Sequence, residues 1–330
     1  MGGVRLGGIA VVLTQYVPLV GTSGGNNAIY TLSQSPGQDP TQRTTPTANN
    51  VIGPVLYPPD GSKILFSHTG NLIEIAANGS PGDEVMIWDG STGVTGFTYS
   101  PDGSTILFTI SDAGTRHNLY TIPADGTDQS GNEVSIYADG SSRQVCGAHY
   151  NFDGSRIAFD VLLSATSIGV WVCDADGTNA AQQATTVTAF SQIQFDQPIT
   201  AWMNLSSRIA WNDGPLSAPV WKTMLDDGTS VVTLATLASG DGRPIWHTWF
   251  QDDTFISRVK SSDQSIHKVA ASGVGDSLLI TPSSAATSSS PRQYGGRIYW
   301  QSSPDIWSCL EDGTDERNET GASAVSFSLL

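Results

Sequence analysis

At 330 residues, the chain has the length of two ordinary domains, but internal repeats have to be sought before that length is divided. Its 15 Lys and Arg residues are outnumbered by 31 Asp and Glu residues, and the net charge of −16 argues against nucleic acid as the main partner, because phosphate binding needs a basic surface. The same charge disfavours anionic membranes. Since no apolar segment is long enough to span a bilayer, we expect no membrane insertion.

The composition predicts an all-β protein. Gly, Ser, Thr, Asp and aromatic residues are plentiful, and the sequence contains no convincing amphipathic helix, which indicates short strands and many turns. The N-terminal segment, residues 1–21, imitates a secretory signal with one Arg and a partly apolar run. Because Gln15, Tyr16 and Pro18 interrupt that run, we interpret the segment as a retained part of the fold.

Two short devices recur along the chain, and both are intact over residues 97–128. The first is an aromatic residue followed by Ser-Pro-Asp-Gly-Ser and an apolar run, Tyr99–Phe108. It predicts a hairpin, because Pro101 fixes one turn φ and Gly103 can take a positive φ between two strand-like runs. The second is an aliphatic and aromatic strand ending in Asp-Gly-Thr, Leu119–Thr127, which predicts a third strand entering another tight turn.

The second device occurs seven times, and its closing glycines recur from Gly37 to Gly313 at a mean spacing of about 46 residues, the length of a four-stranded propeller blade. The copies begin at Ile29, Leu72, Leu119, Val170, Val220, Ile266 and Ile306. The sequence therefore predicts one domain over 1–330, an all-β, seven-bladed β-propeller of four-stranded antiparallel blades. The blades are expected near 54–94, 97–143, 148–200, 200–245, 246–290 and 291–320, with a closing blade formed by 5–47 plus 322–330.

The closing blade is expected to combine the two ends of the chain. The copy at Ile29 lacks a first strand, and we interpret the apolar run Gly8–Leu13 as its second strand. A surplus strand, Ala322–Leu329, follows the last turn. This C-terminal strand should join the N-terminal blade in the innermost position, because that arrangement removes the open ends of the ring and ties down both termini.

These repeats resemble the TolB-like family of β-propeller repeats, whose blades carry an aromatic-Ser-Pro-Asp-Gly hairpin and a strand ending in Asp-Gly-Ser or Asp-Gly-Thr. The resemblance covers nearly the whole chain and is clearest over 54–143. It implies a fold rather than one function, since TolB-like propellers include periplasmic scaffold proteins, lids of peptidases and some polysaccharide lyases. The α/β domain that stands beside the propeller in TolB and in the peptidases has no counterpart in this sequence.

The repeat also predicts roles for the cysteines and one histidine. Cys173 and Cys309 fall in an aliphatic column that includes Ile75, which predicts core packing for both thiols, and they lie three blades apart, too far for a disulfide. Cys146 precedes an innermost strand, and its role stays open. His267 falls in a repeat column of aromatic residues and is predicted to be a packing residue of its own blade. That column contains Tyr30, Tyr120, Trp171, Trp221 and Trp307.

Propeller connectivity assigns the other histidines to one face. Loops from strand 2 to strand 3 and from blade to blade share this loop face, whereas turns between strands 1 and 2 and between strands 3 and 4 share the opposite turn face. The candidate ligand-binding residues expected at the loop face are His68, Arg116, His117, Arg143, His149, Arg243, His247 and Arg292. The acids expected at the turn face are Asp60, Asp102, Asp125, Asp153, Asp174, Asp176, Asp226, Asp227 and Asp312. A basic or neutral mouth of this kind would attract a carboxylate or sulfate group, although loops also hold polar residues for no other reason than solvent exposure.

The leading hypothesis is a non-enzymatic binding or scaffold propeller that presents its loop face to a protein or acidic glycan, with no cofactor, metal or catalytic residue assigned. An extracellular, periplasmic or surface-assembly location is expected over a cytoplasmic one. The resemblance implies one alternative, a metal-dependent uronate lyase in which propeller histidines hold a divalent ion and Arg143 or Arg243 neutralises the substrate carboxylate. Such a site would bring His68, His149 and His247 together at the channel mouth. A lectin is a second alternative, but it needs equivalent pockets between blades, and the degraded loops argue against that equivalence.

Overall fold

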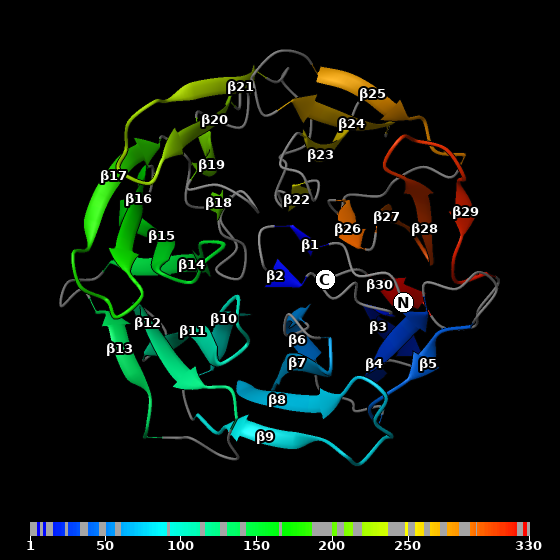
Figure 1. Ribbon diagram of the computed structural model, residues 1–330. Coiled ribbons are helices and arrows are strands. Elements are labelled where there is room, and N and C mark those ends of the chain that lie inside the picture. The colour runs from blue at the N-terminus through cyan, green and yellow to red at the C-terminus, as the bar shows by residue number, and fades with distance from the viewer. Residues whose placement is uncertain are drawn as a thin grey trace.

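The chain folds into β-sheets arranged around a common centre (Figure 1). In the computed structural model the described residues are 5–6, 9–10, 16–23, 26–33, 39–45, 51–56, 61–90, 93–112, 116–125, 131–138, 143–164, 167–186, 200–202, 208–213, 220–236, 248–249, 255–260, 265–270, 276–283, 291–294, 296–321 and 326–328. Across these residues the secondary structure is entirely β, in seven four-stranded antiparallel sheets and one two-stranded hairpin. The predicted all-β class is therefore confirmed.

Six of the sheets each take four strands that follow one another along the chain, with the first strand nearest the centre of the ring (Figure 1). The first two are β6 (Val51–Leu56), β7 (Lys63–His68), β8 (Asn71–Ala76) and β9 (Val85–Trp88), then β10 (Val94–Tyr99), β11 (Thr105–Asp112), β12 (Arg116–Pro123) and β13 (Val134–Tyr137). The next two are β14 (Gln144–Tyr150), β15 (Arg156–Ser164), β16 (Ser167–Asp174) and β17 (Ala181–Thr186), then β18 (Thr200–Trp202), β19 (Arg208–Asp213), β20 (Val220–Leu225) and β21 (Val232–Thr236). The last two are β22 (Thr248–Trp249), β23 (Phe255–Lys260), β24 (Ser265–Ala270) and β25 (Asp276–Ile280), then β26 (Arg292–Tyr294), β27 (Arg297–Ser302), β28 (Asp305–Leu310) and β29 (Arg317–Asn318).

The seventh four-stranded sheet joins the two ends of the chain. Its order is β30 (Ser326–Ser328), β3 (Tyr16–Ser23), β4 (Asn26–Ser33) and β5 (Thr41–Gln42). Phe327 lies opposite Gly21, so the C-terminal strand pairs antiparallel with an N-terminal strand. This pairing is the one that the surplus strand of the sequence predicted.

The expected second strand of that sheet was placed wrongly at Gly8–Leu13. The strand that pairs with β4 is Tyr16–Ser23, over a continuous register from Tyr16 opposite Ser33 to Ser23 opposite Asn26. Its inward side chains Val17 and Leu19 are fully buried in one cluster with residues of β27 and β28, and this packing outweighs the interruption by Pro18. Ile9–Ala10 forms β2 instead, paired with β1 (Arg5–Leu6).

The Asp-Gly turns follow one local design. In the turns between strands 3 and 4, Gly177, Gly228 and Gly313 have φ of 84°, 80° and 84°, a conformation that glycine adopts without a steric penalty. The aspartate before each glycine accepts hydrogen bonds from the threonine after it. For Asp312 these come from the backbone N–H of Thr314 at 2.9 Å and from its hydroxyl at 2.6 Å. The predicted turn chemistry is therefore confirmed in the described turns.

These turns also lock neighbouring sheets together. A Cβ atom added to Gly313 would lie 2.2 Å from the carbonyl oxygen of Leu279 in the preceding sheet, and one added to Gly177 would lie 2.6 Å from that of Ile136. A side chain has no room at either position. The glycines thus serve the turn and the contact between sheets at the same time.

The turn aspartates should make the fold sensitive to acid. Hydrogen bonds from Ser or Thr hydroxyls and N–H groups lower the pKa values of Asp102, Asp153, Asp176, Asp227 and Asp312. Because each folded-state pKa lies below the unfolded value of about 3.9, the unfolded chain binds more protons as the pH falls. The stabilisation is fully present above about pH 5 and is lost as the pH falls through the folded-state values.

Urea unfolding at pH 7 and pH 3 should therefore show a lower free energy of unfolding at pH 3. A variant with asparagine at Asp102, Asp153 and Asp176 should lose less stability over the same interval, because fewer carboxylates remain to be protonated. Equal losses in the two proteins would contradict this assignment.

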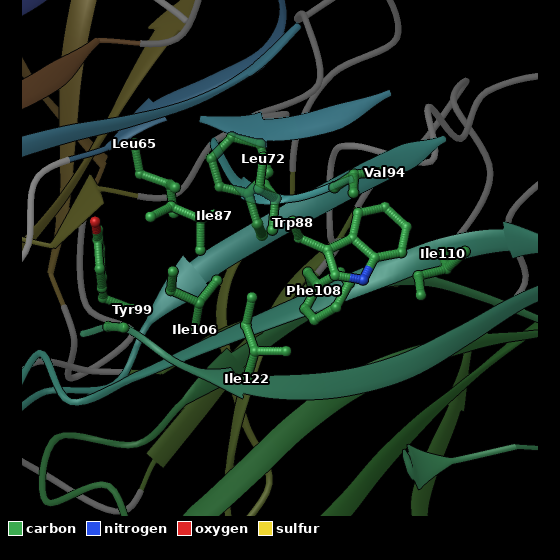
Figure 2. Packing of buried hydrophobic residues seen from close by; sticks show 12 residues of the cluster. Leu65, Leu72, Ile87, Trp88, Val94, Tyr99, Ile106, Phe108, Ile110 and Ile122 are labelled. Atoms are coloured by element: carbon green, nitrogen blue, oxygen red, sulfur yellow. The ribbon is translucent and has the colours of Figure 1, made fainter. Parts of the chain in front are cut away.

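The hydrophobic core lies between adjacent sheets (Figure 2). Leu65, Leu72 and Trp88 of the β6–β9 sheet pack against Ile106 and Phe108 of the β10–β13 sheet. The rings of Trp88 and Phe108 meet edge to face with centroids 5.3 Å apart, a favoured arrangement of aromatic pairs. These two sheets thus bury their facing surfaces against each other.

All three cysteines are free and fully buried in this core. Cys173 and Cys309 pack among aliphatic and aromatic side chains, as predicted, and Cys146 packs with Ile168. Burial raises the pKa values of Cys173 and Cys309 to about 12 and that of Cys146 further still.

At pH 8 we expect a thiol-reactive disulfide reagent to label none of the three cysteines in the native protein and all of them in urea. Rapid native labelling would contradict the burial.

In the β18–β21 sheet, the predicted repeat alignment is wrong by one residue: Trp221 does not take the place that Trp171 takes in its own sheet. Trp171 lies opposite Phe159, and the residue that takes the equivalent place opposite Trp211 is Lys222, not Trp221. Met224 correspondingly takes the place of Cys173, with no exposed surface. The register is set by the turn glycine, Gly228, whose N–H bonds to the carbonyl of Leu225 just as that of Gly177 bonds to Asp174.

Candidate functional site

The strand ends define the two faces of the ring. At the loop face, strand 2 passes to strand 3, as β7 passes to β8 through Thr69 and Gly70, and each outermost strand passes to the innermost strand of the next sheet. At the turn face lie the Asp-Gly turns. Of the acids predicted there, eight occupy described turns or strand ends at that face, and Asp60 lies outside the described residues. The eight are Asp102, Asp125, Asp153, Asp174, Asp176, Asp226, Asp227 and Asp312.

Five of the eight candidate ligand-binding residues have backbone positions at the loop face. Arg116 and His117 begin β12, Arg292 begins β26, Arg143 directly precedes β14, and His68 ends β7. Each of these strands starts or ends at a connection between strands 2 and 3 or between sheets. Two further candidates, Arg243 and His247, lie outside the described residues.

The expected loop-face position of His149 was wrong. The strand β14 begins at the loop face with Gln144, opposite Leu162, and His149 comes one residue before its end, opposite Ala158. A strand rises by about 3.3 Å per residue, so five residues carry the chain roughly 17 Å towards the turn face. His149 therefore lies near the Asp153 turn, at the opposite end of the sheet from His68.

One part of the loop face lies where the β10–β13 and β14–β17 sheets meet. The strands β12 and β14 contact each other directly and both begin at this face. Their first residues bring Arg116, His117 and Arg143 to one end of adjoining elements. Arg143 is exposed. Guanidinium groups bind carboxylates and sulfates through paired, charge-assisted hydrogen bonds, which makes this junction a candidate anion site.

His68 stands in a different setting, on the β6–β9 sheet. It lies between Val51 and Asn71 in the sheet and its side chain is half-buried. The turn that follows it is tight: Thr69 has φ of 52° and Gly70 has φ of 89°. The Thr69 hydroxyl donates to the carbonyl of His68 at 2.7 Å, which fixes the end of β7 at the loop face.

The described part of the loop face also carries acids. Asp112 ends β11 directly opposite Arg116. Asp213 ends β19 and pairs with Lys222 at 2.5 Å. Asp305 begins β28 and accepts a hydrogen bond from the Asn318 amide at 2.9 Å. The charge at this face is mixed, because strands 2 and 3 meet there with acids and bases on facing ends.

The described residues offer no group of three His, Cys, Asp or Glu side chains that could hold a metal ion. The pair His68 and His149, which the lyase alternative would bring together, lies at opposite ends of two different sheets. The third histidine of that alternative, His247, is outside the described residues.

His267 shows how an imidazole can serve the fold instead. It lies opposite Arg258 in the column that holds Trp171 and Trp307, as predicted, and is half-buried. Its Nε2 atom lies 2.9 Å from the hydroxyl of Ser265. This contact ties the side chain to its own strand.

Sequence reasoning missed a set of cations at the first residue of strand 2. Lys63 binds Glu74 at 2.8 Å, Arg156 binds Asp226 of the next sheet at 2.6 Å, and Arg208 donates to the carbonyl of Ser230 at 2.7 Å. The Arg297 guanidinium donates hydrogen bonds to both the carboxylate and the backbone carbonyl of Asp315. Each of these cations is the first residue of strand 2 in its sheet. This shared position in the repeat could have revealed them from the sequence. They serve the turn face of the fold.

The comparisons place the fold among known propeller-like proteins. No family model matches the chain, and no curated protein matches its sequence. Three solved structures resemble it: an oligogalacturonate lyase in complex with manganese (12% identity, 93% of this chain and 85% of that chain, TM-score 0.61), TolB from Acinetobacter baumannii (14%, 94% and 65%, 0.51) and a chain of a nidogen/laminin complex (14%, 80% and 95%, 0.53). At these identities the likeness shows the fold alone, and that fold is a TolB-like propeller.

Within the described residues, no helix is long and apolar enough to cross a membrane.

Proposed function

We propose that residues 1–330 form one seven-bladed propeller domain closed by the C-terminal strand. Seven four-stranded sheets and the pairing of β30 with β3 support this proposal. With β30 in place, each of the seven sheets has an innermost strand. A closed ring would also cover the faces that the two end sheets of an open array expose. It also fixes one loop face on which residues from distant parts of the sequence can meet.

We further propose a non-enzymatic binding or scaffold function, in which the loop face receives a protein or an acidic glycan outside the cytoplasm. The proposal is supported by the backbone positions of Arg116, His117 and Arg143, which lie at or directly before the starts of the contacting strands β12 and β14. The turn-face aspartates Asp176, Asp227 and Asp312 accept hydrogen bonds within their own turns. A carboxylate or sulfate group is the chemistry that this site fits.

Calorimetric titration with trigalacturonate, a short carboxylated glycan, tests the proposal. Wild-type protein should bind it, and Arg143→Gln should weaken binding about tenfold, because a charge-assisted hydrogen bond contributes roughly 1.5–3 kcal/mol. Asp312→Asn at the turn face is the matched control and should leave the affinity unchanged. Equal affinity in wild type and Arg143→Gln would contradict the assigned site.

The same titration separates binding from catalysis. A lyase would release an unsaturated uronate, whose double bond raises ultraviolet absorbance. The binding proposal predicts saturable heat without any rise in absorbance. A rise that persists after purification and disappears with chelator would replace it with the lyase alternative.

A further inference from the structure

One turn between strands 3 and 4 carries an asparagine where three other described turns carry an aspartate. Asn78-Gly79 stands between β8 and β9 in the place that Asp176-Gly177, Asp227-Gly228 and Asp312-Gly313 take in their own sheets. It is the single Asn-Gly pair in the whole sequence. The Gly79 N–H donates to the carbonyl of Ala76 at 2.8 Å, and the other three glycines make the same hydrogen bond to the residue three positions earlier.

The Asn78 side chain is not held by its turn as those aspartates are. Asp176 accepts hydrogen bonds from the N–H of Thr178 at 2.9 Å and from its hydroxyl at 2.6 Å. In the Asn78 turn, Gly79 does not adopt a positive φ, and the N–H of Ser80 donates to Asp83 at 2.9 Å instead. Asn78 is exposed, and within the described parts of the chain its carboxamide makes no hydrogen bond.

The fold requires glycine directly after this asparagine. A Cβ atom added to Gly79 would lie 2.9 Å from Cγ1 of Ile75 and 3.0 Å from the carbonyl oxygen of Ala76, closer than a packed interior allows. A glycine has no Cβ to shield its backbone nitrogen from the side chain before it. The turn therefore places an unrestrained carboxamide next to an unshielded backbone nitrogen.

From this juxtaposition we propose that Asn78 is a site of spontaneous deamidation, which converts it to aspartate and isoaspartate. The Gly79 nitrogen loses its proton to water and attacks Cγ of Asn78. The new N–Cγ bond closes a succinimide ring, the bond from Cγ to the side-chain nitrogen breaks, and that nitrogen takes a proton from water and leaves as ammonia. Water then adds to either ring carbonyl, which gives aspartate or isoaspartate.

The hydrogen bond between Gly79 and Ala76 has to open before the attack. Ala76 and Asn78 are both exposed, so a local opening of this turn is possible without unfolding of the sheet. The reaction also needs the deprotonated backbone nitrogen, and its rate should therefore rise with pH.

The modification reaches a contact between two sheets. Arg43 directly follows β5, in the sheet that joins the two ends of the chain, and donates to the Gly79 carbonyl at 3.2 Å and to the Thr31 hydroxyl at 2.8 Å. Isoaspartate adds one methylene carbon to the backbone before Gly79 and changes the position of this carbonyl, whereas aspartate leaves the backbone length unchanged. Only the isoaspartate form should weaken the contact with Arg43.

The first test incubates the full chain in a mildly alkaline buffer and compares two asparagines by peptide mass spectrometry. Asn132 is the matched internal control, because it is also exposed but precedes Glu133, whose Cβ hinders the backbone nitrogen. The peptide with Asn78 should gain the mass of deamidation and become a substrate of an isoaspartyl methyltransferase, and the peptide with Asn132 should do neither. Asn78→Gln should abolish the signal, because the longer side chain closes a less favourable ring.

Two results of this incubation would overturn the proposal. The first is equal modification of Asn78 and Asn132 in the folded protein. The second is modification of Asn78 in the urea-unfolded chain without any in the folded protein, which would show that the turn protects the residue.

Urea unfolding of the chromatographically separated forms tests the link to Arg43. The unfolding equilibrium constant of the isoaspartate form should exceed that of the unmodified protein about tenfold, the effect of one charge-assisted hydrogen bond. Asn78→Asp carries the new charge without the extra methylene and should stay within about twofold of the unmodified protein, as exposed substitutions do. Equal stability of the isoaspartate form and Asn78→Asp would overturn this link.

Discussion

Replacing Gly313 with alanine is expected to lower the free energy of unfolding by about 2–5 kcal/mol. Gly313 has φ of 84°, where an L-residue is strained, and its new Cβ would lie 2.2 Å from the carbonyl oxygen of Leu279. That oxygen belongs to the backbone of the preceding sheet, so the two sheets have to move apart. Chemical denaturation of Gly313→Ala against the wild type measures the effect.

Gly296→Ala provides the matched control in the same sheet. Gly296 has φ of 79°, but an added Cβ would meet nothing within 4 Å. Its cost should be limited to the backbone strain, about 1–2 kcal/mol. The difference between the two variants isolates the contact between sheets, and equal destabilisation would show that the turn glycines do not lock the sheets together.

The second large effect is expected at Arg297, whose side chain is buried at the start of β27. It donates to the Ser308 hydroxyl at 2.9 Å and to Asp315 at 2.6 Å, and lies 3.7 Å from Glu319. Ser308 and Arg317 also donate to Glu319, whose side chain is 5% exposed. Arg297→Met would leave a buried carboxylate with less compensation, so a loss of about 3–5 kcal/mol is expected in urea unfolding.

Arg208 is the natural comparison for this cluster. It occupies the equivalent position in β19 and donates to the Thr223 hydroxyl and the Ser230 carbonyl. Arg208→Met should therefore cost about 1–2 kcal/mol, the value of lost hydrogen bonds. A similar loss in both variants would show that the buried carboxylate of Glu319 does not dominate the cost at Arg297.

Much of the architecture could be predicted because its turns depend on short, local chemistry. Asp312, Gly313 and Thr314 form their turn through contacts within a few residues, and such contacts are written into the sequence. The placement of β3 at Tyr16–Ser23 could not be predicted in this way. It depends on packing of Val17 and Leu19 against residues near position 300, which no local pattern reveals.

The candidate site could likewise be predicted only in part. Connectivity was enough to place Arg116, His117 and Arg143 at the loop face, because these residues stand at strand starts. His149 was misplaced because its position depends on where β14 begins, five residues earlier.

Hydrogen exchange with and without trigalacturonate tests the central claim most directly. The proposed loop-face function predicts slower exchange of the amides at the starts of β12 and β14, in peptides covering residues 116–119 and 143–146. Exchange in the Asp-Gly turns and in the outermost strand β9 should be unchanged. Protection confined to the turns around Asp153, Asp176 and Asp312, with none at the starts of β12 and β14, would contradict it.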